Sequence, residues 1–331
     1  MVKNFKNDVE AVESLHESLK NLKEEIHKVI IGQDEIIENL LIALLSKGHC
    51  LLIGVPGLAK TLLIKTLAQA LDLKFSRIQF TPDLMPSDIT GTEILEVDPS
   101  SNQRVFKFIK GPIFTNILLA DEINRTPPKT QAALLEAMQE LQVTAAGKKY
   151  ILEEPFFVLA TQNPIEQEGT YPLPEAQLDR FMFNLWLDYP SMEEEIEIVK
   201  TTTIEYEPKV SKVLNREEII FYQNLVRRIP VADNVIQYAV KLANYSRPFD
   251  GAPQYIKDNI SWGAGPRASQ FMIIAAKAKA AMNGSFTPSI DDVRSVAIPV
   301  LRHRIIPTFS AEAEGINSTE IIKKILEEVK Q

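Results

Sequence analysis

An eight-residue segment has the residue types and spacing of a loop that holds phosphate. It reads Gly54, Val55, Pro56, Gly57, Leu58, Ala59, Lys60 and Thr61. Because it follows a predicted strand and opens a predicted helix, backbone N–H groups at the helix N-terminus would face the anion. Lys60 would reach the β- and γ-phosphates, and the Thr61 hydroxyl would bind Mg²⁺. The strict pattern has glycine where Ala59 stands, and alanine fits if its φ is negative. The alternative is a glycine-bearing turn with a surface lysine.

Two carboxylates and an amide follow two further apolar runs. Residues 117–120 lead directly into Asp121 and Glu122, and residues 156–160 lead through Thr161 to Asn163. Phosphoryl transfer needs mainly positioning and charge stabilisation. Asp121 would hold the Mg²⁺ shell, Glu122 would polarise the attacking water, and Asn163 would orient that water or contact the γ-phosphate. Without a phosphate loop beside them, these residues would be an acidic turn and an Asn-Pro turn.

Two arginines complete the candidate chemistry. Arg180 lies just before the apolar run 183–187, and Arg267 lies at the start of a predicted helix much later in the chain. Either could supply positive charge to a transferring phosphoryl group, as arginine fingers do. The alternative for each arginine is a surface ion pair.

The elements that must position these residues alternate between short apolar runs and helices. A charged amphipathic helix over residues 8–30 and a second helix over 33–47 come first. The apolar runs that predict strands are 50–53, 75–80, 117–120, 156–160 and 183–187, and a helix over 62–71 follows the first of them. Short buried runs separated by helices predict an α/β fold with a parallel sheet covered on both faces.

Two segments interrupt this alternation, and the pattern changes after residue 188. Residues 93–108 and 142–152 alternate polar and apolar residues around turn sequences, which predicts two inserted β-hairpins. The second hairpin carries Lys148 and Lys149 at its tip, where they could face an acidic partner or simply be solvated. Beyond the boundary only helices are predicted, over 192–202, 216–227, 233–243, 267–282 and 290–302. We therefore expect an α/β domain over 1–188 and a helical domain over 189–331.

Composition limits the class of protein. The 331 residues suggest about two domains. The net charge of −8 argues against a general binder of nucleic acid or anionic membranes. The densest apolar run, residues 40–45, is too short to span a bilayer, and the N-terminus lacks the apolar region of a signal peptide. A single cysteine, Cys50, fits a reducing compartment, so we expect a cytoplasmic protein.

The order of these motifs resembles that of AAA+ ATPases, and specifically of the MoxR group. The stretches that carry the resemblance lie at 48–61, 120–125, 160–181 and 265–269, within a region from about residue 30 to 305. The third stretch is long and specific, and an alanine at position 59 is usual for the group. The resemblance implies an αβα P-loop core with a five-stranded parallel sheet, β-hairpin insertions and an all-α lid domain.

The resemblance also implies a role for each site residue. Ile31, Gly32 and Gln33 would line the adenine pocket, Gly54 to Thr61 would be Walker A, and Leu62 would also bind the nucleotide. Asp121 and Glu122 would be Walker B, and Asn163 would be sensor 1. Arg267 would be sensor 2, so that loss of the γ-phosphate could move the second domain against the first. Arg180 would be an arginine finger that acts on the neighbouring subunit's nucleotide, and Arg125 could lie at the same interface. The cofactors implied are ATP and Mg²⁺.

The family's partners and activities give several expectations. Its members work as rings, usually hexamers, in chaperone-like maturation of protein complexes, and their usual partner carries a von Willebrand factor A domain. Two related activities stay open: a nucleic-acid motor, against which the acidic charge argues, and the ATPase subunit of a magnesium-chelatase-like complex. An inactive scaffold is a further alternative, although every catalytic residue type is present.

Overall fold

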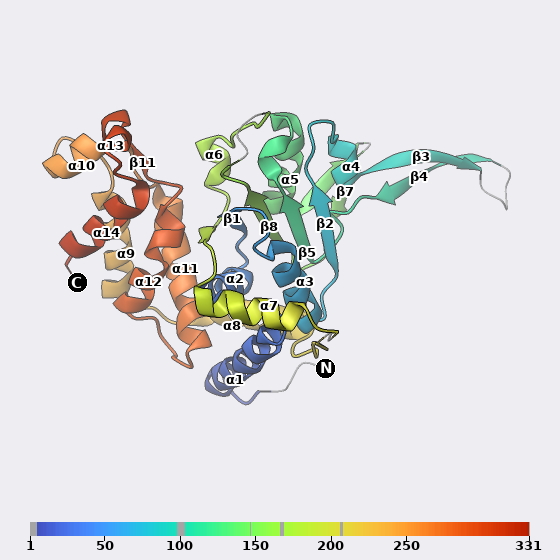
Figure 1. Cartoon of the computed structure of the whole chain (residues 1–331), viewed down its shortest axis with the longest axis horizontal. Coiled ribbons are helices and arrows are strands. Elements are labelled where there is room, and N and C mark those ends of the chain that lie inside the picture. Colours follow the sequence, from blue (N-terminus) through green and yellow to red (C-terminus); the bar gives the residue numbers. More distant parts are fainter. Residues whose placement is uncertain (1–4, 98–102, 146, 166–168, 206–207, 331) are drawn as a thin grey trace.

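A five-stranded parallel sheet forms the centre of the α/β part in a computed structural model that describes residues 5–97, 103–145, 147–165, 169–205 and 208–330 (Figure 1). Its strand order is β2-β5-β8-β1-β9, and every neighbouring pair is parallel. The strands are β1 (Cys50–Gly54), β2 (Phe75–Gln79), β5 (Ile117–Asp121), β8 (Phe157–Gln162) and β9 (Phe183–Leu187). The predicted parallel sheet is therefore confirmed.

Alternate strand residues enter two different apolar cores, which explains why the strands read as continuous apolar runs. Leu52, Leu119 and Leu159 belong to one core, whereas Leu51 and Leu118 belong to the other. All five are fully buried. A strand buried on both faces has no polar side to reveal an alternation in the sequence.

Helices cover both faces of the sheet. One face packs against α1 (Asp8–His27), α2 (Asp34–Leu45) and α3 (Lys60–Ala70), whose apolar residues share one core with it. The opposite core includes residues from α4 (Pro86–Thr90) and α5 (Pro128–Glu140). The short helices η1 (Ile123–Arg125) and α6 (Glu175–Leu178) follow β5 and precede β9 respectively.

The C-terminal part is helical, as predicted, but it also contains a small β-ribbon. Its helices are α7 (Met192–Thr202), α8 (Arg216–Arg228), α9 (Asp233–Tyr245), α10 (Gln254–Asn259), α11 (Pro266–Met282), α12 (Ile290–Leu301), α13 (Phe309–Ala313) and α14 (Ser318–Glu328). The expectation of an all-α lid was wrong in one respect, since β10 (Ile260–Trp262) pairs antiparallel with β11 (Ile306–Pro307). Strands of two and three residues are too short to give a sequence signal. The domain boundary near residue 188 stays a prediction.

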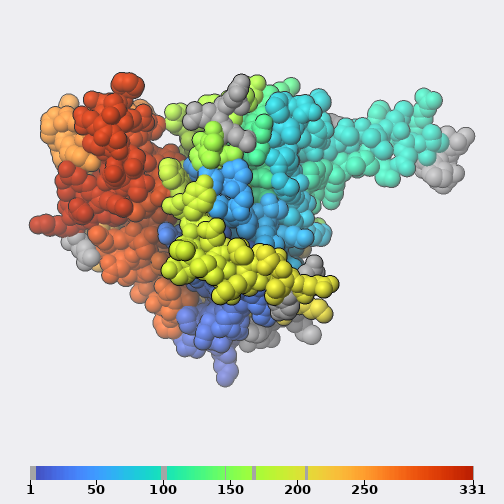
Figure 2. Space-filling model, in the orientation of Figure 1, coloured from blue at the N-terminus to red at the C-terminus, as the bar shows by residue number. Residues whose placement is uncertain are grey.

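Both predicted hairpins are present. The first pairs β3 (Gly91–Val97) with β4 (Arg104–Lys110) and projects as a long arm from the body (Figure 2). The Pro-Ser-Ser-Asn turn predicted at 99–102 lies outside the described residues. The second hairpin pairs β6 (Gln142–Ala145) with β7 (Lys148–Ile151). Tyr150 stacks on Phe108 with ring centroids 4.0 Å apart, and the Lys148 ammonium lies 3.4 Å from the Glu93 carboxylate, so the two hairpins are joined at the base of the arm.

Within the described ranges, no helix combines the length and the apolar character needed to cross a bilayer.

A buried histidine links the start of the sheet to helix α5. The Val158 N–H donates to His49 Nδ1 over 3.1 Å, and His49 Nε2 donates to the Met138 carbonyl over 3.2 Å. Because a backbone N–H can only donate, the ring must be neutral with its proton on Nε2. Burial lowers the pKa of His49 to about 4. This histidine is therefore a structural hydrogen-bonding group.

The neutral state of His49 predicts a loss of stability in mild acid. Between pH of about 6.5 and 4 the unfolded chain binds a proton at this residue that the folded chain does not, so acidification lowers the free energy of unfolding. Urea unfolding at pH 6.5 and pH 5 should show that His49→Gln, which keeps a donor and an acceptor, removes about 1.6 kcal/mol of this pH dependence. An unchanged pH dependence in the variant would contradict this account.

Candidate active site

The phosphate loop connects β1 to α3 at the carboxyl edge of the sheet. Gly57 has φ 88°, a conformation that favours glycine. Ala59 has φ 55°, so the expectation that alanine would need a negative φ was wrong. The left-handed conformation costs an alanine about 1–2 kcal/mol, and the packing of the surrounding fold compensates for this cost. Strain of this kind is typical of functional loops.

Lys60 is held in the loop, close to the acidic strand end. Its Nζ donates to the Gly54 carbonyl over 2.6 Å. Burial lowers the pKa of Lys60, and the negative charges of Asp121 and Glu122 oppose this shift. The lysine and the two carboxylates, separated by about 60 residues in the chain, therefore share one electrostatic environment.

Thr161 joins the two carboxylate positions, because its strand β8 runs parallel to β5. Its Oγ1 donates to Asp121 Oδ1 over 2.6 Å and accepts from the Glu122 N–H over 2.9 Å. Glu122 has φ 56°, so the chain turns sharply at the second carboxylate. The hydroxyl thus fixes both the Asp121 side chain and the backbone of Glu122. Thr161 lies two residues before Asn163, but nothing in the sequence alone indicates its contacts with Asp121 and Glu122.

Arginines contact both carboxylates. Arg77, on β2, donates from Nη2 and Nε to Asp121 Oδ2 over 2.6 and 3.1 Å. Arg125 Nη1 lies 3.2 Å from Glu122 Oε2. Although its strand was predicted, Arg77 was not a predicted site residue, because its pairing with Asp121 depends on the β2–β5 register, in which Gln79 lies opposite Asp121.

Asn163 follows the carboxyl end of β8, the strand between β5 and β1. Its side chain is buried, and its Oδ1 accepts from the Ile165 N–H over 3.1 Å. This fixes the amide group between the acidic strand end and the phosphate loop, because the carboxyl ends of parallel strands share one edge.

A cavity of about 480 Å³ adjoins the phosphate loop. Its wall contains the expected Ile31, Leu58, Ala59 and Leu62 together with residues of α7, among them Glu194. Gln33 Nε2 donates to the Leu58 carbonyl over 3.3 Å, while Gln33 Oε1 is buried without a hydrogen-bond partner. Such an unpaired acceptor at a cavity wall fits a ligand that brings a donor. Gly32 has φ 66°, a conformation that favours glycine, and a Cβ there would lie 1.9 Å from Glu194 Oε1, so the flexible end of the Glu194 side chain would have to move.

The two candidate arginines lie together, but at the opposite edge of the sheet. Arg180 precedes β9, and both Arg180 and Arg267 line a small pocket that also contains Gly48, just before β1. Among the described residues, this pocket shares no lining residue with the cavity beside the phosphate loop. One strand of five residues separates the two edges by about 16 Å.

Asp179 holds Arg267 at that edge. Arg267 Nη1 lies 2.8 Å from Asp179 Oδ2, and the buried Arg304 lies 2.7 Å from Asp179 Oδ1. The Arg180 guanidinium has no ion-pair partner in the part of the chain that the structure describes. The packing of α11 brings Arg267 beside Arg180, away from the phosphate loop of its own chain, and its role as sensor 2 stays a prediction.

Comparisons with known proteins agree with the fold and the site. The family described as "ATPase family associated with various cellular activities (AAA)" matches residues 49–183, and an AAA lid domain matches residues 254–325. "Chaperone MoxR1" of Mycobacterium tuberculosis is 43% identical over 306 residues, which cover 92% of this chain and 80% of that protein. The protein YeaC of Bacillus subtilis is 42% identical, with 96% of each chain covered. A crystal structure from Cytophaga hutchinsonii, assigned as an ATPase, superposes with a TM-score of 0.90 at 42% identity and 97% coverage of both chains.

The phosphate loop on a parallel sheet, with acidic residues on a neighbouring strand and a helical lid, defines an AAA-type ATPase. Within that class, the chain belongs to the MoxR family.

Thr161→Val should uncouple hydrolysis from nucleotide binding. The substitution keeps the shape of the side chain but removes the hydroxyl that fixes Asp121 and Glu122. We expect kcat to fall by roughly tenfold to a hundredfold, the usual effect of losing a group that orients a metal ligand or base. Nucleotide affinity, measured by fluorescence with a labelled ATP analogue, should change little. Thr161→Ser is the matched control and should retain activity; equal rates for the valine variant and the wild type would contradict this role.

Proposed function

We propose that this ATPase works as a ring in which each ATP site is completed by the neighbouring copy. The observation that carries the proposal is the position of Arg180 and Arg267 at the sheet edge opposite the phosphate loop. Neither arginine can serve the nucleotide of its own chain across about 16 Å, but both can meet a phosphate presented by another copy. A head-to-tail arrangement of this kind closes into a ring, for which the family resemblance suggests a hexamer.

Within each site the proposed roles follow from the contacts. Lys60 and the loop backbone bind the phosphates, Glu122 polarises the attacking water, and Asn163 orients that water. The Thr61 hydroxyl and the Asp121 carboxylate supply the oxygen ligands that Mg²⁺ prefers, and the bound ion would neutralise the phosphate charge. The side-chain carbonyl of Gln33 and the side chain of Glu194 adjoin the position proposed for adenine.

We further propose that hydrolysis drives chaperone-like remodelling of protein complexes in the cytoplasm. The relative named "Chaperone MoxR1" supports this role. The projecting β3–β4 arm is suited to contact a client complex, and a von Willebrand factor A domain protein is the partner that the family resemblance suggests. The arm and the second hairpin would move together because Phe108 stacks on Tyr150.

Mixing two inactive variants tests the shared site. Arg180→Ala should lower the ATPase rate by roughly a thousandfold, the scale of an arginine finger, and Glu122→Gln should also be inactive. In an equal mixture, the intact pocket of an Arg180→Ala copy can meet the intact arginine of a Glu122→Gln copy. About a quarter of the interfaces would then be complete, so the mixture should recover about a quarter of the wild-type rate.

The double variant Arg180→Ala/Glu122→Gln mixed with Glu122→Gln is the matched control, because none of its interfaces can be complete. The ATPase rate recovered by the mixture of Arg180→Ala and Glu122→Gln should rise with protein concentration. Failure of the first mixture to recover activity while both variants still form rings would show that the arginine acts within its own chain.

A further inference from the structure

Helix α7 exposes an apolar stripe next to the nucleotide cavity. Met192, Ile196 and Val199 follow the i, i+4, i+7 spacing of one helix face, and their exposed fractions are 75%, 46% and 54%. Glu194 and Ile198 lie on the other face and line the nucleotide cavity. No residue of α7 is buried. Figure 2 shows this helix lying on the surface of the molecule. A large apolar stripe on so exposed a helix indicates a contact that a single chain does not provide.

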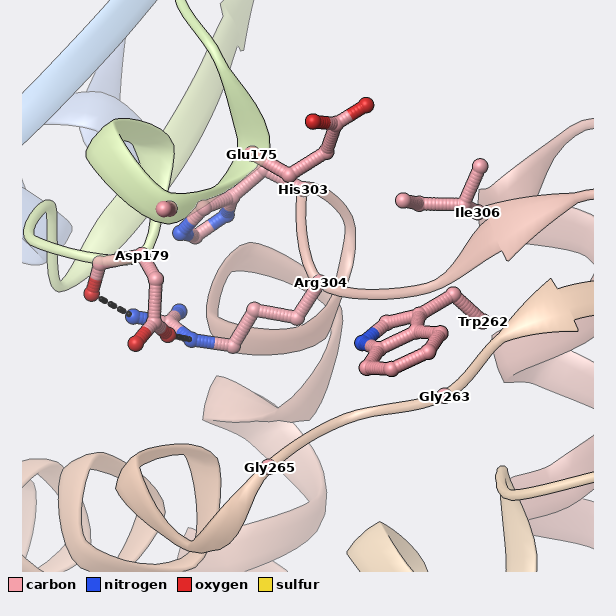
Figure 3. Close-up of a pocket in the computed structure, with 9 residues that line it drawn as sticks. Glu175, Asp179, Trp262, Gly263, Gly265, His303, Arg304 and Ile306 are labelled. Atoms are coloured by element: carbon pink, nitrogen blue, oxygen red, sulfur yellow. Dashed lines mark hydrogen bonds and ion pairs between the residues drawn. The ribbon is translucent and has the colours of Figure 1, made fainter.

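A second apolar surface lies between the α/β part and the helical part of the chain. A cleft of about 530 Å³ separates α6 from the β10–β11 ribbon. Figure 3 shows the Trp262 indole and the Ile306 side chain on the ribbon side, facing Glu175 and Asp179 of the α/β part. Trp262 is 70% exposed. Tryptophan in a concave surface is typical of the residues that anchor protein interfaces.

The α7 stripe and the Trp262 cleft each lie next to one half of the proposed shared ATP site. The cleft is lined by Asp179, which holds Arg267 and directly precedes Arg180. The α7 stripe belongs to the helix that forms a wall of the nucleotide cavity. When Arg180 of one copy approaches the phosphates of another, the cleft of the first copy and α7 of the second are carried into the same interface.

The charges around the arginine pocket and the nucleotide cavity are complementary. The pocket that contains Arg180 and Arg267 also contains Lys47 and, among the described residues, no carboxylate, whereas the cleft contains Glu175 and Asp179 with Arg304. The nucleotide cavity and the α7 groove carry five carboxylates and one cation: Asp34, Glu35, Asp188, Glu194 and Glu195, with Lys200. Opposite net charges would steer the arginine pocket of one copy towards the nucleotide cavity of another and disfavour contact between like surfaces.

We infer that the apolar stripe of α7 in one copy docks into the Trp262 cleft of the next copy. The inference rests on the proposed ring and names the surfaces that hold it together. The occupant of the cleft is thus a second copy of this chain, and the contact couples the wall of one nucleotide cavity to the lid of the neighbouring copy.

Tryptophan fluorescence tests the docking directly, because the chain has only Trp186 and Trp262. In Trp186→Phe, Trp262 is the sole tryptophan, and its emission should shift to shorter wavelength as rings form with ATP and Mg²⁺. Light scattering on the same samples reports the mass of the assembly.

Val199→Asp should raise the protein concentration at half-assembly about tenfold or more, because it places a charge in the apolar contact. Val240→Asp on α9, at a residue that is 48% exposed, is the matched control and should leave this concentration unchanged.

The outcomes separate this inference from the proposed function. Rings that form without a shift of Trp262 emission would overturn the docking and leave the shared site standing. A shift that follows nucleotide but not protein concentration would report a change within one chain and would also overturn it. If Val199→Asp and Val240→Asp raised the protein concentration at half-assembly equally, α7 would not be the helix that docks into the cleft. Absence of any ring at high concentration would overturn the docking and the proposed ring together.

Discussion

The parallel direction of the five strands is the constraint on which the ATPase site depends. It brings the carboxyl ends of β1, β5 and β8 to one edge, so Lys60, Asp121 and Thr161 meet although they are far apart in the chain. The same polarity places the amino end of β9, and with it Arg180, at the other edge. The separation of the phosphate loop from the arginines is therefore a property of the sheet, which a movement of side chains cannot remove.

The residues at the carboxyl edge could be predicted because each follows an apolar run that marks a buried strand. Arg77 could not, since its contact with Asp121 depends on the register between two strands. The position of Arg267 also required the structure: the sequence marks the start of α11, but the packing of that helix decides which edge of the sheet it reaches. The β10–β11 ribbon and the left-handed Ala59 have no local signal, because both depend on tertiary packing.

The polar contacts show how the site keeps its geometry. Asp121 is held by a hydroxyl on one oxygen and by a guanidinium on the other, which offsets the cost of a largely buried carboxylate. Asp179 holds two arginines at the opposite edge, while the Arg180 guanidinium is left without an ion-pair partner among the described residues. An arginine in this state can meet an incoming phosphate without first breaking an ion pair within its own chain.

The central claim is that one copy of the chain contains only part of the catalytic machinery. The most direct measurement is the light-scattering mass of Glu122→Gln with and without ATP and Mg²⁺, since this variant should bind nucleotide without hydrolysing it. The account predicts a nucleotide-dependent ring, about six times the mass of the single chain for a hexamer. A mass that stays at 37.2 kDa under all conditions, in a preparation that binds ATP, would contradict it.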